Sequence, residues 1–156
     1  EDVVKRLSRR RRTLSVAESC TGGRLSAMIT SVPGASRVFR EGLVAYENGV
    51  KRNRLGVRAA TLRRFGAVSE ETAREMAAGS RRANRTDYAL SVTGIAGPSG
   101  GTKGKPVGLV CFAFAGPSGI RAATRRFQGD RPTIQDRSAH HALNMLLLEE
   151  FSLRGR

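Results

Sequence analysis

The 156-residue sequence has no tryptophan, few aromatic residues and only two cysteines. Aromatic side chains make up 5% of the chain, too few to build the stacking platforms that hold single-stranded nucleic acid in many proteins. The cysteines, Cys20 and Cys111, lie in separate predicted strands. Two thiols without a secretory signal indicate a reducing compartment rather than a fold held together by disulfides. We therefore expect a cytoplasmic location.

Long apolar runs and metal-binding patterns are also absent from the sequence. No apolar run approaches the roughly 20 residues of a membrane-spanning helix, and the stretch at 13–17 is too short for the apolar region of a signal peptide. His140 and His141 are adjacent in a predicted helix, so their side chains point about 100° apart and cannot share one ion. We expect exposed or helix-capping histidines, no metal, no cofactor and no membrane partner.

The residue in excess is arginine. The formal net charge is +15, and only four of the 28 basic residues are lysines. One dense basic block covers residues 5–12, whereas the other arginines are scattered along the chain. A scattered excess is also what a GC-rich genome would produce. We therefore interpret the block as a solvated helix face that binds nucleic acid only through nonspecific charge.

The length and the apolar patterns predict one α/β domain. Strands are predicted at residues 14–17, 42–46, 88–93, 107–115 and 120–128. Helices are predicted at residues 3–7, 25–32, 61–65, 69–82 and 132–147, with a loop and a short helix in 48–57. The fourth strand is apolar enough to be buried on both faces, and the fifth is polar enough to lie near an edge. This order predicts a three-layer α/β/α sandwich with a mixed central sheet.

Residues 13–23, TLSVAESCTGG, predict a strand, a tight polar turn and the start of a helix. A helix start presents free backbone N–H groups, which favour an anion or a developing oxyanion. The turn also holds two adjacent candidate nucleophiles, Ser19 and Cys20. Neighbouring residues in a turn rarely both face one ligand, so we expect one of them to be structural, and a small buried cysteine is the common case.

A serine nucleophile needs a base within hydrogen-bond reach. In a chain so poor in lysine, Lys51 is a candidate, five positions after Tyr46 and at the same expected end of the sheet. Lowering a lysine pKa from about 10.4 to near 7 takes roughly 4–5 kcal/mol of differential interaction and requires burial or a neighbouring cation. From spacing alone a surface lysine is favoured. If Lys51 is the base, Tyr46 can relay the proton.

Residues 94–106 form a glycine-rich loop that matches several motifs in part. Residues 97–101 fit G-x-S-x-G, but a nucleophile elbow needs a helix directly after the serine, and here a loop and a strand follow. The spacing of a Walker A loop is absent. The loop either contacts a phosphate or sugar, with Lys103 and Lys105, or is a flexible connection. Thr93 precedes it and can point its hydroxyl into the same cleft.

Five long motifs carry a family resemblance: AESCTGG (17–23), GLVAYENGVK (42–51), GAVSEE (66–71), SVTGIAGPSGGTKGKPVGLV (91–110) and FQGDR (127–131). They resemble the C-terminal domain of CinA, whose stand-alone form resembles nicotinamide-nucleotide amidase, and the match covers residues 1–153. The resemblance implies one amidohydrolase domain over residues 1–156, with an α/β/α fold, no catalytic metal and a homo-oligomeric state. It implies hydrolysis of nicotinamide mononucleotide (NMN) to nicotinate mononucleotide and ammonia in pyridine-nucleotide salvage.

The resemblance also implies roles for individual residues. The family's serine, tyrosine and lysine fall on Ser19, Tyr46 and Lys51. Ser19 would attack the carboxamide while Lys51, with Tyr46, moves the proton. We expect further substrate contacts, including oxyanion donors in the turn, from Cys20, Thr21, Gly22, Gly23, Thr93, Gly94 and, for the phosphate, Arg131. Two alternatives remain open: a cysteine amidase that uses Cys20, and a non-enzymatic module that binds a nucleotide, DNA or a recombination protein.

Overall fold

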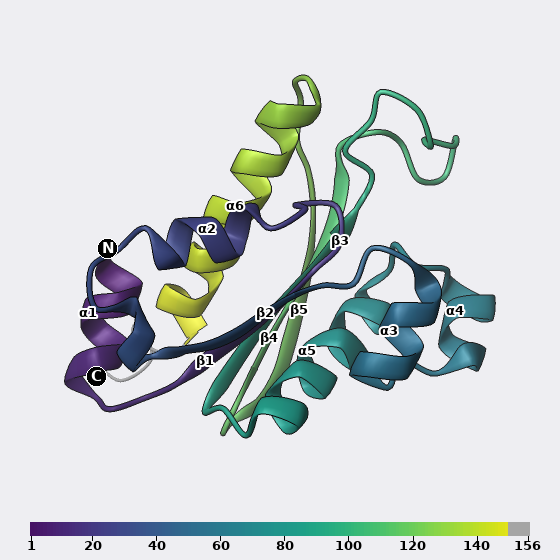
Figure 1. Cartoon of the computed structure of the whole chain (residues 1–156). Helices are drawn as coiled ribbons and strands as arrows, with labels where there is room; N and C mark the ends of the chain where they lie inside the picture. Colours follow the sequence, from purple (N-terminus) through teal and green to yellow (C-terminus); the bar gives the residue numbers. More distant parts are fainter. Residues whose placement is uncertain (150–156) are drawn as a thin grey trace.

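The computed structural model describes residues 1–149 (Figure 1). The helices are α1 (Asp2–Arg9), α2 (Arg24–Thr30), α3 (Asn48–Leu55), α4 (Ala59–Phe65), α5 (Glu70–Asn84) and α6 (Arg131–Leu147), with a short 3-10 helix, η1 (Ala35–Arg37). The strands are β1 (Leu14–Glu18), β2 (Phe39–Val44), β3 (Tyr88–Gly94), β4 (Leu109–Gly116) and β5 (Gly119–Arg126). None of the helices within residues 1–149 is long and apolar enough to cross a membrane.

The five strands form one mixed sheet in the order β2-β1-β3-β4-β5. β1 pairs in parallel with β2 and β3, whereas β4 pairs antiparallel with β3 and β5. Helices α1, α2 and α6 cover one face, and α5 covers the other, with α3 and α4 packed against α5 (Figure 1). The predicted three-layer sandwich is confirmed. So are the burial of β4 on both faces and the edge position of β5.

The two faces of the sheet bury side chains of different size, because successive residues of a strand point to opposite faces. The face under α1, α2 and α6 carries Leu14, Val16, Leu90, Val92, Val110, Phe112 and Phe114. The face under α3 and α5 carries Ala17, Ala89, Ala113 and Ala115, together with the buried serines Ser15 and Ser91. The strands therefore carry large apolar side chains on one face and small side chains on the other.

Small residues bring α3 and α5 close together beside the second face. A Cβ atom on Gly79 of α5 would lie 1.8 Å from the carbonyl oxygen of Leu55, the last residue of α3. The buried hydroxyls on this face are satisfied: Ser80 donates to Ser15, and Ser91 donates to the carbonyl of Ala73. The close packing fixes α3, and with it Lys51, against the end of the sheet.

Four predicted strand boundaries are wrong by two or three residues, among them the start of the second strand, at Phe39 instead of residue 42, and the end of the fifth, at Arg126 instead of residue 128. The second strand ends at Val44 instead of residue 46, because the chain turns into α3, which replaces the expected loop and short helix. The fourth strand starts at Leu109 instead of residue 107, because Gly108 turns the chain with a φ of +88°. No helix follows Ser99, so the rejection of a nucleophile elbow is confirmed.

The expectation of exposed or helix-capping histidines holds for only one of the two. His140 is exposed, but His141 is partly buried, with its ring 4.7 Å from the ring of Phe112. Burial lowers the pKa of His141. Within residues 1–149, no group of three His, Cys, Asp or Glu side chains is placed to hold a metal ion.

Candidate active site

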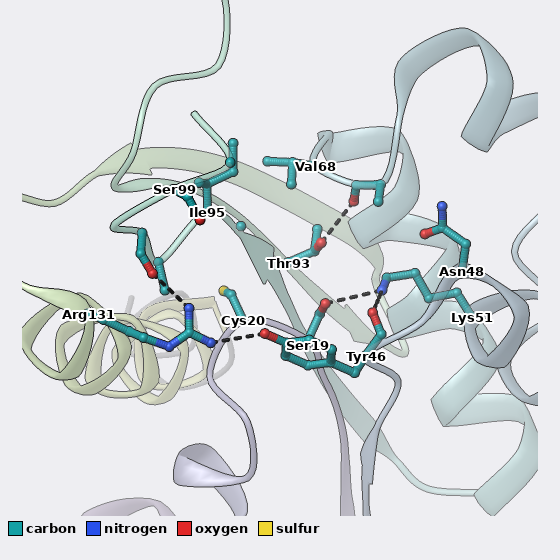
Figure 2. A pocket seen from close by; sticks show the side chains of 15 residues that line it. Ser19, Cys20, Tyr46, Asn48, Lys51, Val68, Thr93, Ile95, Ser99 and Arg131 are labelled. Carbon is teal, nitrogen blue, oxygen red and sulfur yellow. Dashed lines mark hydrogen bonds between the residues drawn. The ribbon is translucent and has the colours of Figure 1, made fainter. Parts of the chain in front are cut away.

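One pocket lies at the carboxyl ends of β1 and β3 (Figure 2), the end at which ligands bind in open α/β sheets. Its volume is about 350 Å³, within the range of small-molecule sites. The lining residues are Ser19, Cys20, Tyr46, Asn48, Lys51, Ala67, Val68, Thr93, Gly94, Ile95, Ala96, Gly97, Ser99, Gly100 and Arg131. The pocket therefore gathers residues from the turn after β1, the α3 region, the segment between α4 and α5, the end of β3, the glycine-rich loop and α6.

The start of α2, expected to offer free N–H groups, is already occupied by a carboxylate of the chain itself. Glu18 is fully buried, and its side chain accepts hydrogen bonds from the N–H groups of Gly23, Leu25 and Ser26 and from the Ser26 hydroxyl. This carboxylate satisfies the unpaired donors of the first helical turn and complements the helix dipole. The expectation of an external anion at this helix start is therefore wrong.

Two of the expected substrate-binding amides are also engaged. Gly22 donates to the Ser19 carbonyl at 3.2 Å, and Gly23 donates to Glu18; neither glycine lines the pocket. In the part of the chain that the structure describes, the amides of Cys20 and Thr21 donate to no main-chain carbonyl. They are the amides of this turn left as candidate oxyanion donors. The Thr21 side chain is fully buried and does not line the pocket.

Lys51 is buried beside Ser19, so the expectation of a surface lysine is wrong. Its side chain is 1% exposed. Its Nζ atom lies 3.1 Å from Ser19 Oγ, 2.7 Å from the Ala45 carbonyl oxygen and 3.1 Å from the Tyr46 carbonyl oxygen (Figure 2). No described carboxylate forms an ion pair with it. Burial without a counter-ion disfavours the ammonium form and lowers the pKa of Lys51.

The three contacts of Lys51 fit an ammonium group that donates to all three oxygens, and they also allow a neutral amine. A neutral amine has two N–H donors and one lone pair, whereas an ammonium group has three donors. The carbonyls of Ala45 and Tyr46 can only accept, so they take the two N–H groups. When Lys51 is neutral, its lone pair faces the Ser19 hydroxyl. This is the geometry in which a lysine can remove a proton from a serine.

Tyr46 and Arg131 meet at the mouth of the pocket. The Tyr46 side chain is 60% exposed, and its hydroxyl accepts a hydrogen bond from Arg131 Nη2 at 2.9 Å. Arg131 Nη1 donates to the Gly97 carbonyl at 2.8 Å. Tyr46 contacts Lys51 through its main-chain carbonyl, and Lys51 reaches Ser19 directly. The expected proton relay through the Tyr46 hydroxyl is therefore not formed in this structure.

The end of β3 supplies Thr93 and Gly94. The Thr93 hydroxyl donates to the Ala67 carbonyl at 2.8 Å. A Cβ on Gly94 would lie 2.8 Å from the Leu109 carbonyl oxygen of β4. Gly94 lines the pocket, but the close approach of β4 already accounts for a glycine at this position.

Cys20 borders the pocket from the apolar side of the sheet. It is buried and packs in the core under α2 and α6, as expected of a structural cysteine. Burial raises the pKa of its thiol to about 12, which disfavours the nucleophilic thiolate. Gln135 of α6 donates to the Cys20 carbonyl at 2.7 Å and holds the turn in place.

Sequence reasoning missed several residues of the site. Glu18 caps α2 across the turn at 19–23, and its position six residues before the helix gave no capping signal in the sequence. Asn48 and Ser99 line the pocket from segments interpreted as loops, and no spacing marked them. The same holds for the apolar wall of Val68 and Ile95, which comes from two distant segments.

The fold and the pocket define a single α/β/α domain with a buried serine–lysine pair at the carboxyl end of a parallel strand. The family model of the CinA C-terminal domain matches residues 1–149, and the chain belongs to that family. A CinA-like protein from Anaeromyxobacter sp. (strain Fw109-5) is 52% identical over 146 residues, or 94% of this chain. The chain spans only 36% of the length of that relative.

Solved structures of the family have the same fold. The competence/damage-inducible protein CihA from Agrobacterium tumefaciens has a TM-score of 0.92 and 40% identity, over 94% of this chain and 90% of that one. A CinA superfamily protein from Escherichia coli has a TM-score of 0.90 and 34% identity, over 94% and 85% of the two chains. These similarities cover the fold and nearly the whole of residues 1–149.

Proposed function

We propose that this chain is a nicotinamide-nucleotide amidase that hydrolyses NMN to nicotinate mononucleotide and ammonia. The observation that carries the proposal is the 3.1 Å contact between Ser19 Oγ and the buried Nζ of Lys51. Burial lowers the pKa of Lys51, so the lysine can be neutral and act as a base. The resemblance of the motifs around both residues to nicotinamide-nucleotide amidases suggests the substrate.

In the proposed acylation, Lys51 takes the proton of Ser19 as Oγ forms a bond to the carboxamide carbon. The amides of Cys20 and Thr21 stabilise the oxyanion, and one such donor is typically worth about 10²–10³-fold in rate. Protonated Lys51 then gives its proton to the nitrogen, the C–N bond breaks and ammonia leaves. Water attacks the acyl-enzyme with Lys51 again as base. The C–O bond to Ser19 then breaks, Lys51 returns the proton to Ser19 Oγ, and nicotinate mononucleotide is released.

The pocket walls suggest how the nucleotide lies. Val68 and Ile95 form an apolar surface near Thr93 (Figure 2), suited to a pyridine ring. Arg131 stands at the mouth with two of its five N–H groups engaged, by Gly97 and Tyr46. The remaining N–H groups can bind a phosphate, which fits the bidentate geometry of arginine. We assign the buried end of the pocket to the carboxamide and the mouth to the phosphate.

The test is ammonia release from NMN by the wild type and by Ser19→Ala. We expect release by the wild type and a loss of about 10⁴-fold or more in the variant. Cys20→Ala is the matched control, because it alters the neighbouring thiol and should stay within a few-fold of wild type. Release that survives Ser19→Ala and disappears in Cys20→Ala would assign the chemistry to the cysteine. No release from the wild type would refute the amidase.

The second candidate is a non-enzymatic module that binds DNA. Its support is a hollow beside α1, lined by Lys5, Arg6, Arg9 and Arg10 with Asp2. In Figure 1, α1 lies away from the carboxyl ends of β1 and β3, where the pocket is. This candidate predicts DNA binding with no turnover of NMN. A steep loss of DNA affinity with added salt would indicate nonspecific charge binding only.

We also propose that the active form is a cytoplasmic homo-oligomer, as the family resemblance implies. Sedimentation velocity of the purified chain tests the oligomeric state, and fractionation of the source cell tests the location. A monomer at all concentrations would contradict the first part.

A further inference from the structure

The hydroxyl group of Thr93 already donates its proton in a hydrogen bond within the protein. Thr93 is 1% exposed, lines the pocket and lies 2.8 Å from the Ala67 carbonyl oxygen. A carbonyl oxygen can only accept, so Thr93 must be the donor in this bond. Its oxygen then has only lone pairs to offer to a ligand. In this arrangement Thr93 can accept a hydrogen bond from a substrate but cannot donate one to an oxyanion.

Thr93 lies next to Ser19 across two parallel strands. Glu18 pairs with Val92, and Ser19 N–H donates to the Val92 carbonyl at 2.9 Å. Continuing this register places Ser19 opposite Thr93, at the spacing of neighbouring strands, about 4.8 Å. Val92 belongs to the core under α2 and α6, so Thr93, one residue later, points to the other face, toward α3 and α5. Figure 2 shows Ser19, Thr93 and Lys51 in one group at the inner end of the pocket.

Lys51 takes a similar arrangement when it is neutral. Its two N–H groups are then held by the carbonyls of Ala45 and Tyr46, and its lone pair faces Ser19. In that state the nucleophile is bordered by two hydrogen-bond acceptors, one from Lys51 and one from Thr93. A group that satisfies the Thr93 acceptor must bring its own donor. The NH₂ of a primary carboxamide does so, whereas a carboxylate or an ester brings only acceptors.

We propose that Thr93 is a specificity-determining residue that accepts a hydrogen bond from the NH₂ of the scissile carboxamide and disfavours the carboxylate product. This inference rests on the proposed amidase function and deepens it. The bond persists as the nitrogen gains its proton from Lys51 and leaves as ammonia. In the product, a carboxylate oxygen faces the lone pairs of Thr93, and this repulsion promotes release.

The test compares an amide with an ester in the full chain. The substrates are NMN and the methyl ester of nicotinate mononucleotide; both yield nicotinate mononucleotide, measured by chromatography. Thr93→Val keeps the shape and removes the acceptor. We expect kcat/KM for the amide to fall about 10–100-fold, as for a lost hydrogen bond of about 1.4–2.8 kcal/mol, and kcat/KM for the ester to stay within about 3-fold. Thr93→Ser should retain the amide-to-ester ratio of the wild type.

Ser91→Ala is the matched structural control. Ser91 lies two residues earlier on the same strand and face, and its hydroxyl also donates to a main-chain carbonyl, that of Ala73, but it does not line the pocket. We expect both Ser91→Ala and Thr93→Val to lower Tm by a few degrees, because each leaves a carbonyl unpaired. Only Thr93→Val should change the amide-to-ester ratio.

The outcomes separate this inference from the function on which it rests. Equal losses for amide and ester in Thr93→Val would mean that Thr93 only holds the Ala67 loop, and would overturn the inference. An unchanged amide rate would also overturn it. No turnover of either substrate by the wild type would refute the amidase itself. A selective loss for the amide, restored by serine, supports the inference.

Discussion

The two faces of the sheet differ in the size of the side chains that they bury and in what those side chains contribute. The face under α1, α2 and α6 is filled with leucine, valine and phenylalanine and forms the largest core cluster. The face under α3 and α5 carries alanine, serine and threonine, with short hydrogen bonds to helix and loop carbonyls. Burial of large apolar side chains contributes most of the stability of a domain, so the first face is the main source of stability.

The face under α3 and α5 instead determines where the reacting groups lie. Its short side chains let α5 lie close to the sheet, and Gly79 lets α3 lie close to α5. Lys51 on α3 therefore reaches Ser19, and the polar residues of the candidate site lie on this side. The large side chains under α1, α2 and α6 therefore stabilise the fold, and the small ones under α3 and α5 position the reacting groups. Substitutions on the two faces should separate stability from activity.

The largest effect is expected on amidase activity, from Lys51→Met in α3. Methionine has a similar length and no basic nitrogen, so amidase activity should fall by about 10⁴-fold. Stability should stay the same or rise, because a buried amine without a counter-ion is costly. Steady-state ammonia release and urea unfolding measure the two quantities. Retained amidase activity in Lys51→Met would contradict the assignment of Lys51 to chemistry.

Phe112→Ala, on the face under α1, α2 and α6, should lower stability and leave activity unchanged. Phe112 is fully buried on β4, and truncation of a buried phenylalanine costs about 3–5 kcal/mol of unfolding free energy. The folded fraction should keep its kcat, because Phe112 does not line the pocket. Urea unfolding and kcat at a temperature well below Tm test this pair of outcomes. A lower kcat in the fully folded variant would show that the face under α1, α2 and α6 also shapes the site.

Gly79→Ala should affect both quantities, because it acts on the contact that positions α3. The added methyl group would overlap the Leu55 carbonyl and push α3 away from α5. Overpacking of this kind costs about 1–3 kcal/mol, and a displaced Lys51 should lower kcat. Ala83→Gly in the same helix is a control at an exposed position, with a helix-propensity cost of about 1 kcal/mol and no effect on kcat. Unchanged kcat in Gly79→Ala would show that Lys51 is positioned by β2 alone.

The smallest effect is a pH dependence of stability from Lys51. Burial lowers the pKa of Lys51 in the folded state below its ordinary value of 10.5. Between the folded and unfolded pKa values the unfolded chain binds more protons, so the free energy of unfolding rises with pH in that window and levels off above the unfolded pKa. Urea unfolding at several pH values should show this slope in the wild type and lose it in Lys51→Met. Amidase activity should rise with pH as Lys51 loses its proton.

Much of the fold could be predicted from the sequence, because local patterns determine it. The periodicity of apolar residues predicted the helices and strands, and the apolar run of β4 predicted a strand buried on both faces. Boundaries failed where a glycine or a turn overrides periodicity, as at Gly108 and at the end of β2. The motifs around Ser19 and Lys51 identified the family without any structure.

Tertiary structure alone decided what those residues can do. The sequence separates Ser19 from Lys51 by 32 positions, and only the packing of α3 brings their side chains within 3.1 Å. The burial that lowers the pKa of Lys51 and the hydrogen bond that Thr93 donates to the Ala67 carbonyl both depend on contacts between distant segments. A sequence determines which groups are present, but protonation and hydrogen-bond direction follow from the partners that folding supplies.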